Sequence, residues 1–190
     1  MYGCLSKEHQ AIKAKLENPV PITILPHPQY TGRHKLFDIG IIELAQDVNP
    51  SDASPICLAQ ERDPLRPVMT SVGFGRHDPR QPSEGVMRSI NLTLDTSLTL
   101  KQRGLIITQD RGNTLCQGDS GSPLFRIRNN AAYLLGISAG AENVTDDMPI
   151  RGSMTYKNRF VDVRTELPWI CALTGVFENI ETEVDNFGAG

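Results

Sequence analysis

Short apolar runs separated by turn residues extend through most of this 190-residue chain. Residues 89–94 alternate polar and apolar side chains, which is the period of two typical of a strand with one buried face. Residues 68–75 indicate a strand that ends in a glycine bend, and residues 132–138 indicate another strand. Loops rich in polar residues are expected around 76–85 and 140–157. The pattern predicts an all-β fold.

Composition narrows the classes of function. Hydrophobic residues make up 39% of the chain, which is enough for a packed core at this length. The net charge of −3 gives no basic surface for nucleic acid. No apolar run has the roughly 18 residues needed for a membrane helix. We expect neither a nucleic-acid partner nor a membrane partner, and no metal or organic cofactor.

The residues from Cys116 to Leu124 read Cys-Gln-Gly-Asp-Ser-Gly-Ser-Pro-Leu. They place Ser120 on a tight, glycine-rich loop between a cysteine and an apolar strand. Backbone N–H groups lie on both sides of such a hydroxyl, and a developing oxyanion needs such donors during acyl transfer. The segment therefore predicts a serine nucleophile.

This segment resembles the nucleophile loop of the trypsin-like (chymotrypsin-fold) serine endopeptidases. Residues 37–44 resemble the same family's Asp-Ile-Ala-Leu-Leu segment, and residues 167–170 resemble the start of its closing helix. The resemblance covers roughly residues 20–172. It implies two antiparallel Greek-key β-barrels with a short C-terminal helix and an active site between the barrels.

The resemblance also implies domain boundaries. One peptidase domain is expected over 1–172, with the first half-barrel to about residue 60 and the second barrel over about 65–165. The C-terminal helix is expected at about 165–172, and an acidic flexible tail at 173–190. The first barrel is expected to lack its opening strands, which leaves unpaired backbone groups and apolar surface.

The family's catalytic roles transfer to matching positions. Ser120 would attack the scissile carbonyl, the N–H groups of Gly118 and Ser120 would hold the oxyanion, and Asp38 would orient an imidazole. Asp119 would pair with an amino terminus released by proteolytic activation. The substrate-binding candidates are Thr114, Gln117, Ser138, Gly140 and Asn158. Because Thr114 and Asn158 are neutral, we do not expect a preference for Arg or Lys in the substrate.

The general-base histidine of the family has no counterpart in the chain. If Cys4 matches the family cysteine that follows this histidine, Gly3 stands in its place. Four histidines occur elsewhere, and each is interpreted as a solvated loop residue: His9, His27, His34 and His77. We therefore expect the 190-residue polypeptide to be close to inactive.

The cysteines and the glycosylation sequons are relevant to whether the protein is secreted. By the resemblance, Cys57 and Cys171 are candidates for a disulfide. Asn91 and Asn143 each begin an Asn-x-Thr sequon and are candidate glycosylation sites. The chain has no secretion signal, although the family is mostly secreted. We therefore expect a secreted, extracellular protein whose beginning is absent from this sequence.

Three functions remain open at this point. The first is a serine endopeptidase that acts on peptide or protein substrates and is a target of protease inhibitors. The second is a catalytically inactive pseudo-protease that serves as a secreted binding module. The third is a structural secreted β-domain that reuses the scaffold.

Overall fold

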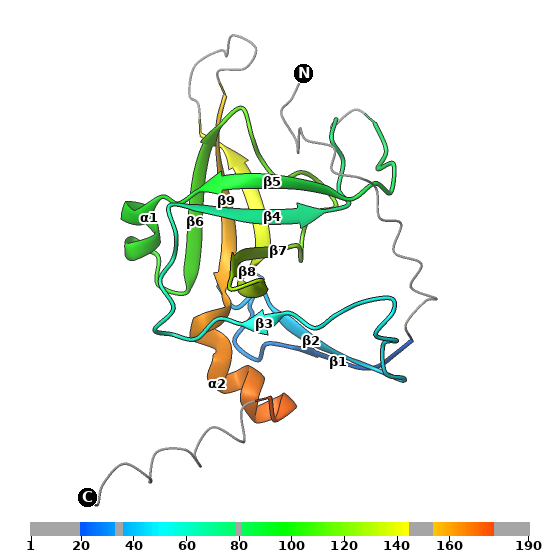
Figure 1. The fold of residues 1–190 in the computed structure, drawn as a ribbon. Helices are drawn as coiled ribbons and strands as arrows, with labels where there is room; N and C mark the ends of the chain where they lie inside the picture. Colours follow the sequence, from blue (N-terminus) through cyan, green and yellow to red (C-terminus); the bar gives the residue numbers. More distant parts are fainter. Residues whose placement is uncertain (1–19, 33–35, 79–80, 145–153, 177–190) are drawn as a thin grey trace, which may run out of the picture.

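The computed structural model describes residues 20–32, 36–78, 81–144 and 154–176. The larger sheet curls into a barrel, in the strand order β5-β4-β7-β8-β9-β6 (Figure 1). A bridge between Leu94 and Thr108 joins its two ends, so the barrel closes. Its strands are β4 (Val68–Gly73), β5 (Arg88–Thr93), β6 (Leu105–Arg111), β7 (Pro123–Arg128), β8 (Ala131–Asn143) and β9 (Thr155–Asp162).

Alternating side chains fill this barrel, as the sequence pattern predicts. Along β4 and β5, Met69, Ile90 and Leu92 are buried, whereas Asn91 and Thr93 between and after them are exposed. The buried side chains form one hydrophobic cluster with members from most strands: Ala59, Met69, Ile90, Leu92, Ile106, Leu115, Leu124, Leu135 and Phe160. The predicted second barrel is therefore confirmed as the main core.

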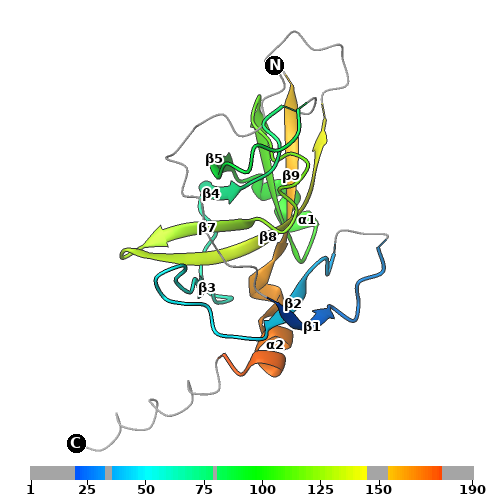
Figure 2. The same ribbon diagram turned by 90° about the vertical axis from the view of Figure 1, so that its right-hand side faces the viewer.

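The first half of the fold is a two-stranded antiparallel ribbon of β1 (Pro21–Pro26) and β2 (Gly40–Leu44). It lies below the barrel, beside the C-terminal helix (Figures 1 and 2). Its apolar side chains are open to solvent: Ile22 is 63% exposed, Ile24 64% and Ile42 60%. Within the described residues this is the incomplete first barrel that the sequence predicts, since a ribbon without partner strands cannot cover its own faces.

One short pairing differs from the expected antiparallel arrangement. β3 (Cys57–Leu58) runs parallel to β8, with Cys57 opposite Tyr133 and Leu58 opposite Leu134. It belongs to the connection between ribbon and barrel, and the N–H of Ala59 continues the contact by donating to the carbonyl of Leu134 over 3.0 Å. The connection is thus held on the barrel by backbone bonds.

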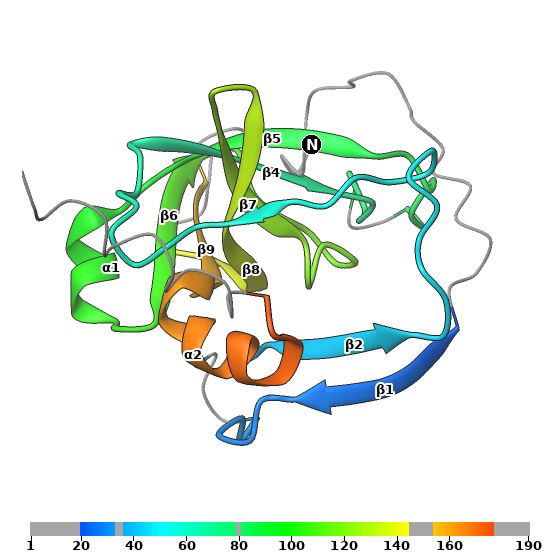
Figure 3. The same cartoon turned by 60° about the horizontal axis from the view of Figure 1, so that its bottom comes forward.

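The C-terminal helix α2 (Val163–Thr174) lies against the ribbon (Figure 3). It begins earlier than the predicted residue 165, because Asp162 caps it by accepting from the N–H of Arg164 over 3.1 Å. Pro168 consequently lies inside the helix. Gly175 ends the helix with a φ of 66°, beyond the expected residue 172.

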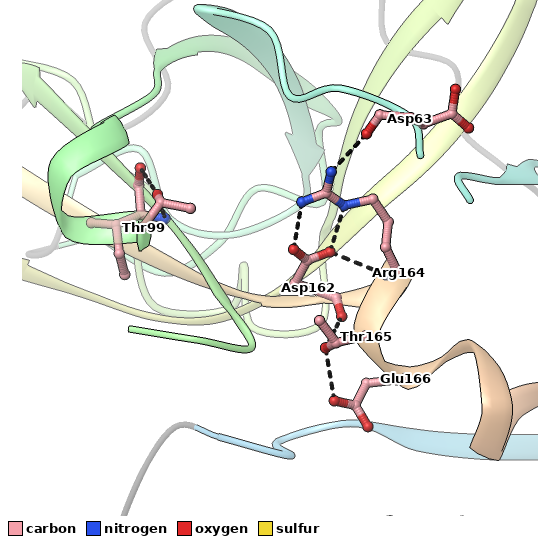
Figure 4. A network of polar contacts seen from close by, with 7 residues as sticks. Asp63, Thr99, Asp162, Arg164, Thr165 and Glu166 are labelled. Carbon is pink, nitrogen blue, oxygen red and sulfur yellow. Dashed lines mark hydrogen bonds and ion pairs between the residues drawn. The ribbon is translucent and has the colours of Figure 1, made fainter. Parts of the chain in front are cut away.

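A network of ion pairs and hydrogen bonds holds the start of α2 (Figure 4). The guanidinium of Arg164 donates to both carboxylate oxygens of Asp162, at 2.9 and 2.6 Å, and to the carbonyl of Asp63 at 2.6 Å. Asp63 also pairs with Arg126 of β7 at 2.6 Å. The connector, the barrel and the helix therefore meet at one network.

A second helix, α1 (Thr96–Lys101), was not expected from the sequence. Asp95 caps it by accepting from the N–H of Leu98 over 2.9 Å. Neither of the two described helices has the length and apolar character needed to cross a membrane. Across the described residues, no three His, Cys, Asp or Glu side chains gather where they could hold a metal ion.

The predicted disulfide between Cys57 and Cys171 is not formed in the structure. Both residues are free thiols, with Cys57 exposed and Cys171 half-buried. Cys171 of α2 lines a surface hollow with Gln60 and Glu61, whereas Cys57 on β3 is not part of that lining. The two side chains therefore meet different surroundings. Gly3 and the predicted tail lie outside the described residues, except for residues 173–176.

Candidate active site

Three predicted site residues line one cavity between the ribbon and the barrel. Asp38, Ser120 and Ser138 contribute to its lining, and its volume is about 660 Å³. Asp38 precedes β2 of the ribbon, Ser120 lies in the loop before β7, and Ser138 belongs to β8. The rest of the wall is largely apolar and includes Ile24, Ile41, Leu58, Leu134, Ile137, Val163 and Ile170.

Glycines determine the shape of the Ser120 loop. Gly118 has a φ of 96°, and a Cβ at this position would stand 3.1 Å from the Cα of Gly75. Gly121 has a φ of 82°. Both values lie in the left-handed region, where glycine carries no steric cost. The turn is then closed by the N–H of Gly121, which donates to the carbonyl of Ser138 over 2.9 Å.

The loop's amide groups fall into two sets. The N–H groups of Asp119 and Ser122 donate within the loop, to the carbonyls of Cys116 at 3.0 Å and Asp119 at 3.1 Å. Among the described residues, the N–H groups of Gly118 and Ser120 donate no hydrogen bond. Ser120 is exposed. A hydroxyl and two available amide donors are therefore present on one exposed turn.

Asp38 is held by the segment before β2. Phe37 adopts a positive φ of 59°, which is uncommon for a bulky residue. Its ring stacks on the imidazole of His27, with centroids 4.8 Å apart and planes inclined by 12°. The N–H of His27 donates to the carbonyl of Ile39 over 2.9 Å. Contacts on both sides of Asp38 thus hold its backbone and compensate for the unfavourable φ of Phe37.

His27 does not occupy the solvated loop position that the sequence suggested. It is buried, and its Nε2 lies 3.3 Å from the Oε2 of the equally buried Glu166 in α2. Trp169 contacts its ring edge-on, at 4.7 Å between centroids. The apolar neighbours from the ribbon and α2 explain the burial. No local sequence signal marks Glu166 as the partner.

The other histidines do not complete the site. His77 is half-exposed, and its Nδ1 lies 3.6 Å from the Oε1 of Glu84. It is not among the residues that line the cavity. His9 and His34 lie outside the described residues, as does Gly3. Of the described histidines, neither is part of the cavity wall that Ser120 and Asp38 share.

Asp119 points away from solvent, into the barrel. Its carboxylate accepts from the N–H groups of Gly75 at 2.8 Å and Cys116 at 2.9 Å. Burial raises the pKa of this group, while the hydrogen bonds from Cys116 and Gly75 and the charge of Arg88 lower it, and the net shift is upward. The carboxylate thus ties the Ser120 loop to the glycine bend after β4.

The neutral pair Thr114 and Asn158 lies in the interior behind the loop. The hydroxyl of Thr114 is 2.9 Å from the Oδ1 of Asn158, which also accepts from the N–H of Leu115 at 2.9 Å. The Nδ2 of Asn158 donates to the hydroxyl of Thr108 over 3.2 Å. The two residues are in contact with one another, and neither lines the cavity beside Ser120.

The remaining substrate-binding candidates lie around the loop. Gln117 is exposed, and its carbonyl accepts from the N–H of Arg76 over 3.0 Å. Ser138 is paired with Phe160 of β9 and Gly140 with Arg159, which leaves Ala139 as the extra residue of a β-bulge. Of these three candidates, only Ser138 reaches the cavity lining.

Both sequon asparagines are on the surface. Asn91 is exposed on β5, where its side-chain oxygen accepts from the hydroxyl of Thr70 over 3.0 Å. Asn143 is exposed at the end of β8. Neither site is shielded by the fold.

Comparison with known proteins gives a consistent family. The model of the Trypsin family matches residues 5–163. CLIP domain-containing serine protease B15 of Anopheles gambiae is 28% identical over 160 residues, which cover 74% of this chain and 43% of that protein. Ovochymase-2 of Mus musculus is 27% identical over 169 residues, 78% of this chain and 28% of that protein.

A further relative matches a shorter part of the chain. Atrial natriuretic peptide-converting enzyme of Mus musculus is 33% identical over 124 residues, which cover 60% of this chain and 11% of that protein. The chain therefore spans less than half the length of these curated relatives.

Proposed function

Because this chain belongs to the trypsin family of serine proteases, we propose that it carries a serine endopeptidase site in which Ser120 is the nucleophile. The observation that carries the proposal is the shared cavity of Ser120, Asp38 and Ser138. A peptide carbonyl presented to the exposed turn would meet the Ser120 hydroxyl on one side. The N–H groups of Gly118 and Ser120 would donate hydrogen bonds to the carbonyl oxygen as negative charge develops on it.

The chemical step requires a base. In acyl transfer an imidazole takes the proton of the serine hydroxyl and later donates it to the leaving amine, while a carboxylate orients the imidazole. Asp38 is assigned the orienting role, because it lines the cavity that contains Ser120. Hydrolysis then ends with water attacking the acyl-serine ester, which releases the acid and restores the hydroxyl.

The 190-residue polypeptide is proposed to be close to inactive, because its described histidines are engaged elsewhere. His27 pairs with buried Glu166, and His77 lies beside Glu84. Loss of the histidine in a related triad costs on the order of 10⁶ in turnover. An intact oxyanion hole leaves roughly 10³–10⁴ over the reaction in water.

The substrates are proposed to be peptides or proteins without a basic residue at the cleavage position. Thr114 and Asn158 satisfy one another and offer no carboxylate to a substrate Arg or Lys. Gln117 and Gly140, beside the loop and on β8, are assigned to contacts with the bound peptide. Protease inhibitors, which bind such clefts as substrates do, are further proposed partners.

Secretion and modification are part of the same proposal. Exposed Asn91 and Asn143 are proposed to carry glycans in a secreted, extracellular protein. Glycosidase sensitivity of the protein expressed in insect or mammalian cells tests this directly. An unchanged mass after treatment of the secreted protein would rule it out.

A second candidate function is a peptide-binding module without turnover. It is favoured by one observation, the engagement of His27 with Glu166 deep between the ribbon and α2. In this case the cavity binds peptides, and Ser120 is not used as a nucleophile. Peptides bound by the module would be recovered intact.

Addition of imidazole separates the two functions. The full chain is incubated with a mixture of peptide esters and amides, with and without imidazole as an external base. The endopeptidase site predicts that imidazole raises ester hydrolysis at least about tenfold, and that the gain is lost in Ser120→Ala and reduced in Asp38→Ala. Peptide binding without any imidazole-dependent hydrolysis would favour the binding module.

A further inference from the structure

The strands β4 and β7 pair over a short stretch and then separate. Thr70 stands opposite Phe125 and Ser71 opposite Leu124. The start of β4 stays paired with β5, and the end of β7 stays paired with β8 in a hairpin that projects from the barrel (Figure 2). A cavity of about 320 Å³ lies at this split, lined by residues of both strands. It shares no lining residue with the candidate active site.

Three arginines line this cavity, and the described residues of its wall include no carboxylate. Arg66 lies in the segment before β4, whereas Arg126 and Arg128 belong to β7. Residues two apart on a strand project to the same side, so the two arginines of β7 are presented together. Arg66 is exposed and has no ion-pair partner among the described residues. The wall therefore presents positive charge to a molecule that enters the cavity.

One carboxylate outside the wall, that of Asp63, is shared by both arginines of β7. Its Oδ1 lies 2.6 Å from the Nη2 of Arg126 and 3.4 Å from the Nη1 of Arg128. Its Oδ2 accepts from the N–H of Gln60 over 2.9 Å. Within the described residues, three guanidinium charges thus face one carboxylate charge, which leaves an excess of positive charge at the cavity.

Arg126 is the fixed member of the three. Its side chain is 6% exposed, and its Nη1 donates to the carbonyl of Pro64 over 3.2 Å. Its Cζ lies 5.9 Å from the centroid of the Tyr133 ring. Its Nε is buried and has no hydrogen-bond partner among the described residues. A buried guanidinium with an unsatisfied N–H is costly, and an anionic group bound in the cavity would offset its charge.

Two exposed apolar side chains lie beside the arginines. Val68 of β4 is 54% exposed and Ile127 of β7 is 71% exposed, and both line the cavity. A free phosphate or sulfate ion would leave them uncovered, as would a sulfated glycan, which has no apolar side chains. A peptide with carboxylates next to an apolar residue matches both features, because guanidinium groups bind carboxylates through paired hydrogen bonds and apolar contact removes surface from water.

We propose that the split between β4 and β7 is a docking site for an acidic peptide segment of a partner protein. Arg66 and Arg128 bind the carboxylates of the segment, and Arg126 supplies a fixed charge behind them. Val68 and Ile127 contact an apolar side chain between the carboxylates. Docking does not depend on the proposed function, because the two cavities are separate.

Fluorescence anisotropy of a labelled Glu-Val-Glu-Val-Glu peptide measures docking to the full 190-residue chain. The peptide Gln-Val-Gln-Val-Gln is the matched control, since it has the same apolar residues and no charge. We expect the acidic peptide to bind at least about tenfold more tightly than the neutral one at about 0.15 M salt, and to lose most of this advantage at about 1 M salt. Equal binding of the two peptides, or no binding of the acidic one, would overturn the proposal.

Two double variants remove the same charge at different places. Arg66→Gln with Arg128→Gln removes the exposed cations of the site, whereas Arg103→Gln with Arg111→Gln removes two exposed arginines outside its wall. We expect the first variant to weaken binding of the acidic peptide at least about tenfold. The second should weaken it less than about twofold, because exposed charges outside the contact are largely screened by salt. Equal effects of the two variants would overturn the site.

Two further titrations identify the occupant. Heparin that binds more tightly than the acidic peptide, and loses its binding in the Arg66 and Arg128 double variant, would overturn a peptide in favour of a sulfated glycan. Residues 177–190 of this chain carry four acidic residues and no basic one. Peptide binding that appears only after their removal would overturn a partner protein in favour of the chain's own end.

Labelling of Ser120 by a fluorophosphonate in the presence of imidazole is measured in parallel. Ser120→Ala is expected to bind the acidic peptide as wild type does. If the peptide binds and Ser120 is not labelled, the proposed function fails and the docking site stands. If Ser120 is labelled and the peptide does not bind, the docking site fails and the function stands.

Discussion

The hydroxyl of Thr114 and the side-chain carbonyl oxygen of Asn158 are 2.9 Å apart in the barrel interior, and both side chains are buried. The same asparagine accepts from the N–H of Leu115 and donates to Thr108. One fully buried amide therefore joins β6, β9 and the segment before the Ser120 loop. The loop's position relative to the barrel depends on it.

Removing this amide is expected to be costly. Asn158→Ala leaves the Leu115 N–H and the Thr108 hydroxyl without this partner in a buried site, whereas the Thr114 hydroxyl keeps the Leu115 carbonyl as acceptor. Each unsatisfied buried group costs about 1–3 kcal/mol. We expect a loss of about 3–5 kcal/mol in the free energy of unfolding. Urea denaturation followed by circular dichroism measures it.

Asn91→Ala is the matched control on the same sheet. Its oxygen accepts a single bond from Thr70 and is exposed, so the loss should stay below about 0.5 kcal/mol. Equal losses for both variants would show that the Asn158 network is not structurally important.

Gly75→Ala tests the contact between the β4 bend and the Ser120 loop. The added methyl group would stand 2.4 Å from the Asp119 Cγ and force the carboxylate out of its site. We expect a loss of several kcal/mol, on the scale of overpacking combined with two broken hydrogen bonds. The loss of stability is measured by thermal unfolding of Gly75→Ala and compared with that of Gly85→Ala.

Gly85 is a control because no atom lies near its Cβ position, although its φ of 67° is positive and that of Gly75 is not. Its replacement should cost only the left-handed backbone term, about 1–2 kcal/mol. A Gly75→Ala variant as stable as Gly85→Ala would mean that Asp119 does not occupy the described pocket.

The cap of α1 is expected to be sensitive to acid. The hydrogen bond from Leu98 and, to a lesser degree, that from Ser97 lower the pKa of Asp95 below its ordinary value, against an opposing effect of burial. A carboxyl group with a lowered folded-state pKa stabilises the fold above its unfolded pKa, near 4, and this contribution is lost as the pH falls through the folded pKa.

Asp95→Ala should therefore cost about 1 kcal/mol at pH 7, and the difference from wild type should shrink towards pH 2. Denaturant titrations at pH 7, 4 and 2 measure this trend. Asp52→Ala, in an exposed turn, serves as the control and should be nearly neutral. A difference that grows on acidification would mean that Asp95 does not cap the helix as a carboxylate.

The buried histidine is expected to hold the ribbon against α2. His27→Ala removes the partner of buried Glu166 and the ring between Phe37 and Trp169. Leaving the buried Glu166 carboxyl without this partner costs about 1–3 kcal/mol, and loss of the buried ring adds to this. His77→Ala, whose partner Glu84 is half-exposed, should cost less than about 1 kcal/mol.

Differential scanning calorimetry of both variants provides the comparison. Because Phe37 precedes Asp38, we also expect His27→Ala to weaken imidazole-dependent hydrolysis, whereas His77→Ala should not. Equal unfolding temperatures of the two variants would show that the contact between His27 and Glu166 does not hold the ribbon against α2.

The sequence predicts individual strands well because alternation is a local pattern, whereas the barrel is expected from the family resemblance. Alternation over residues 89–94 identifies Ile90 and Leu92 as inward-facing, and both are buried. The loop at Ser120 is similarly predictable, since Gly118 and Gly121 are required by its left-handed turns. These features depend on residues that are neighbours in the chain.

Long-range contacts are not predictable in the same way. The pairing of His27 with Glu166 joins residues 139 positions apart, and no pattern at either residue indicates it. The disulfide expected between Cys57 and Cys171 relied on the resemblance alone, and the structure has two free thiols.

The central claim is that Ser120 is a nucleophile in a prepared turn beside Asp38, in a polypeptide that lacks the base to activate it. The most direct measurement is the rate and stoichiometry with which a fluorophosphonate modifies Ser120 in the full chain, followed by mass spectrometry, with Ser120→Ala as the blank. We predict slow, substoichiometric labelling that imidazole accelerates. Rapid, stoichiometric modification without imidazole, or no modification of Ser120 under either condition, would contradict this account.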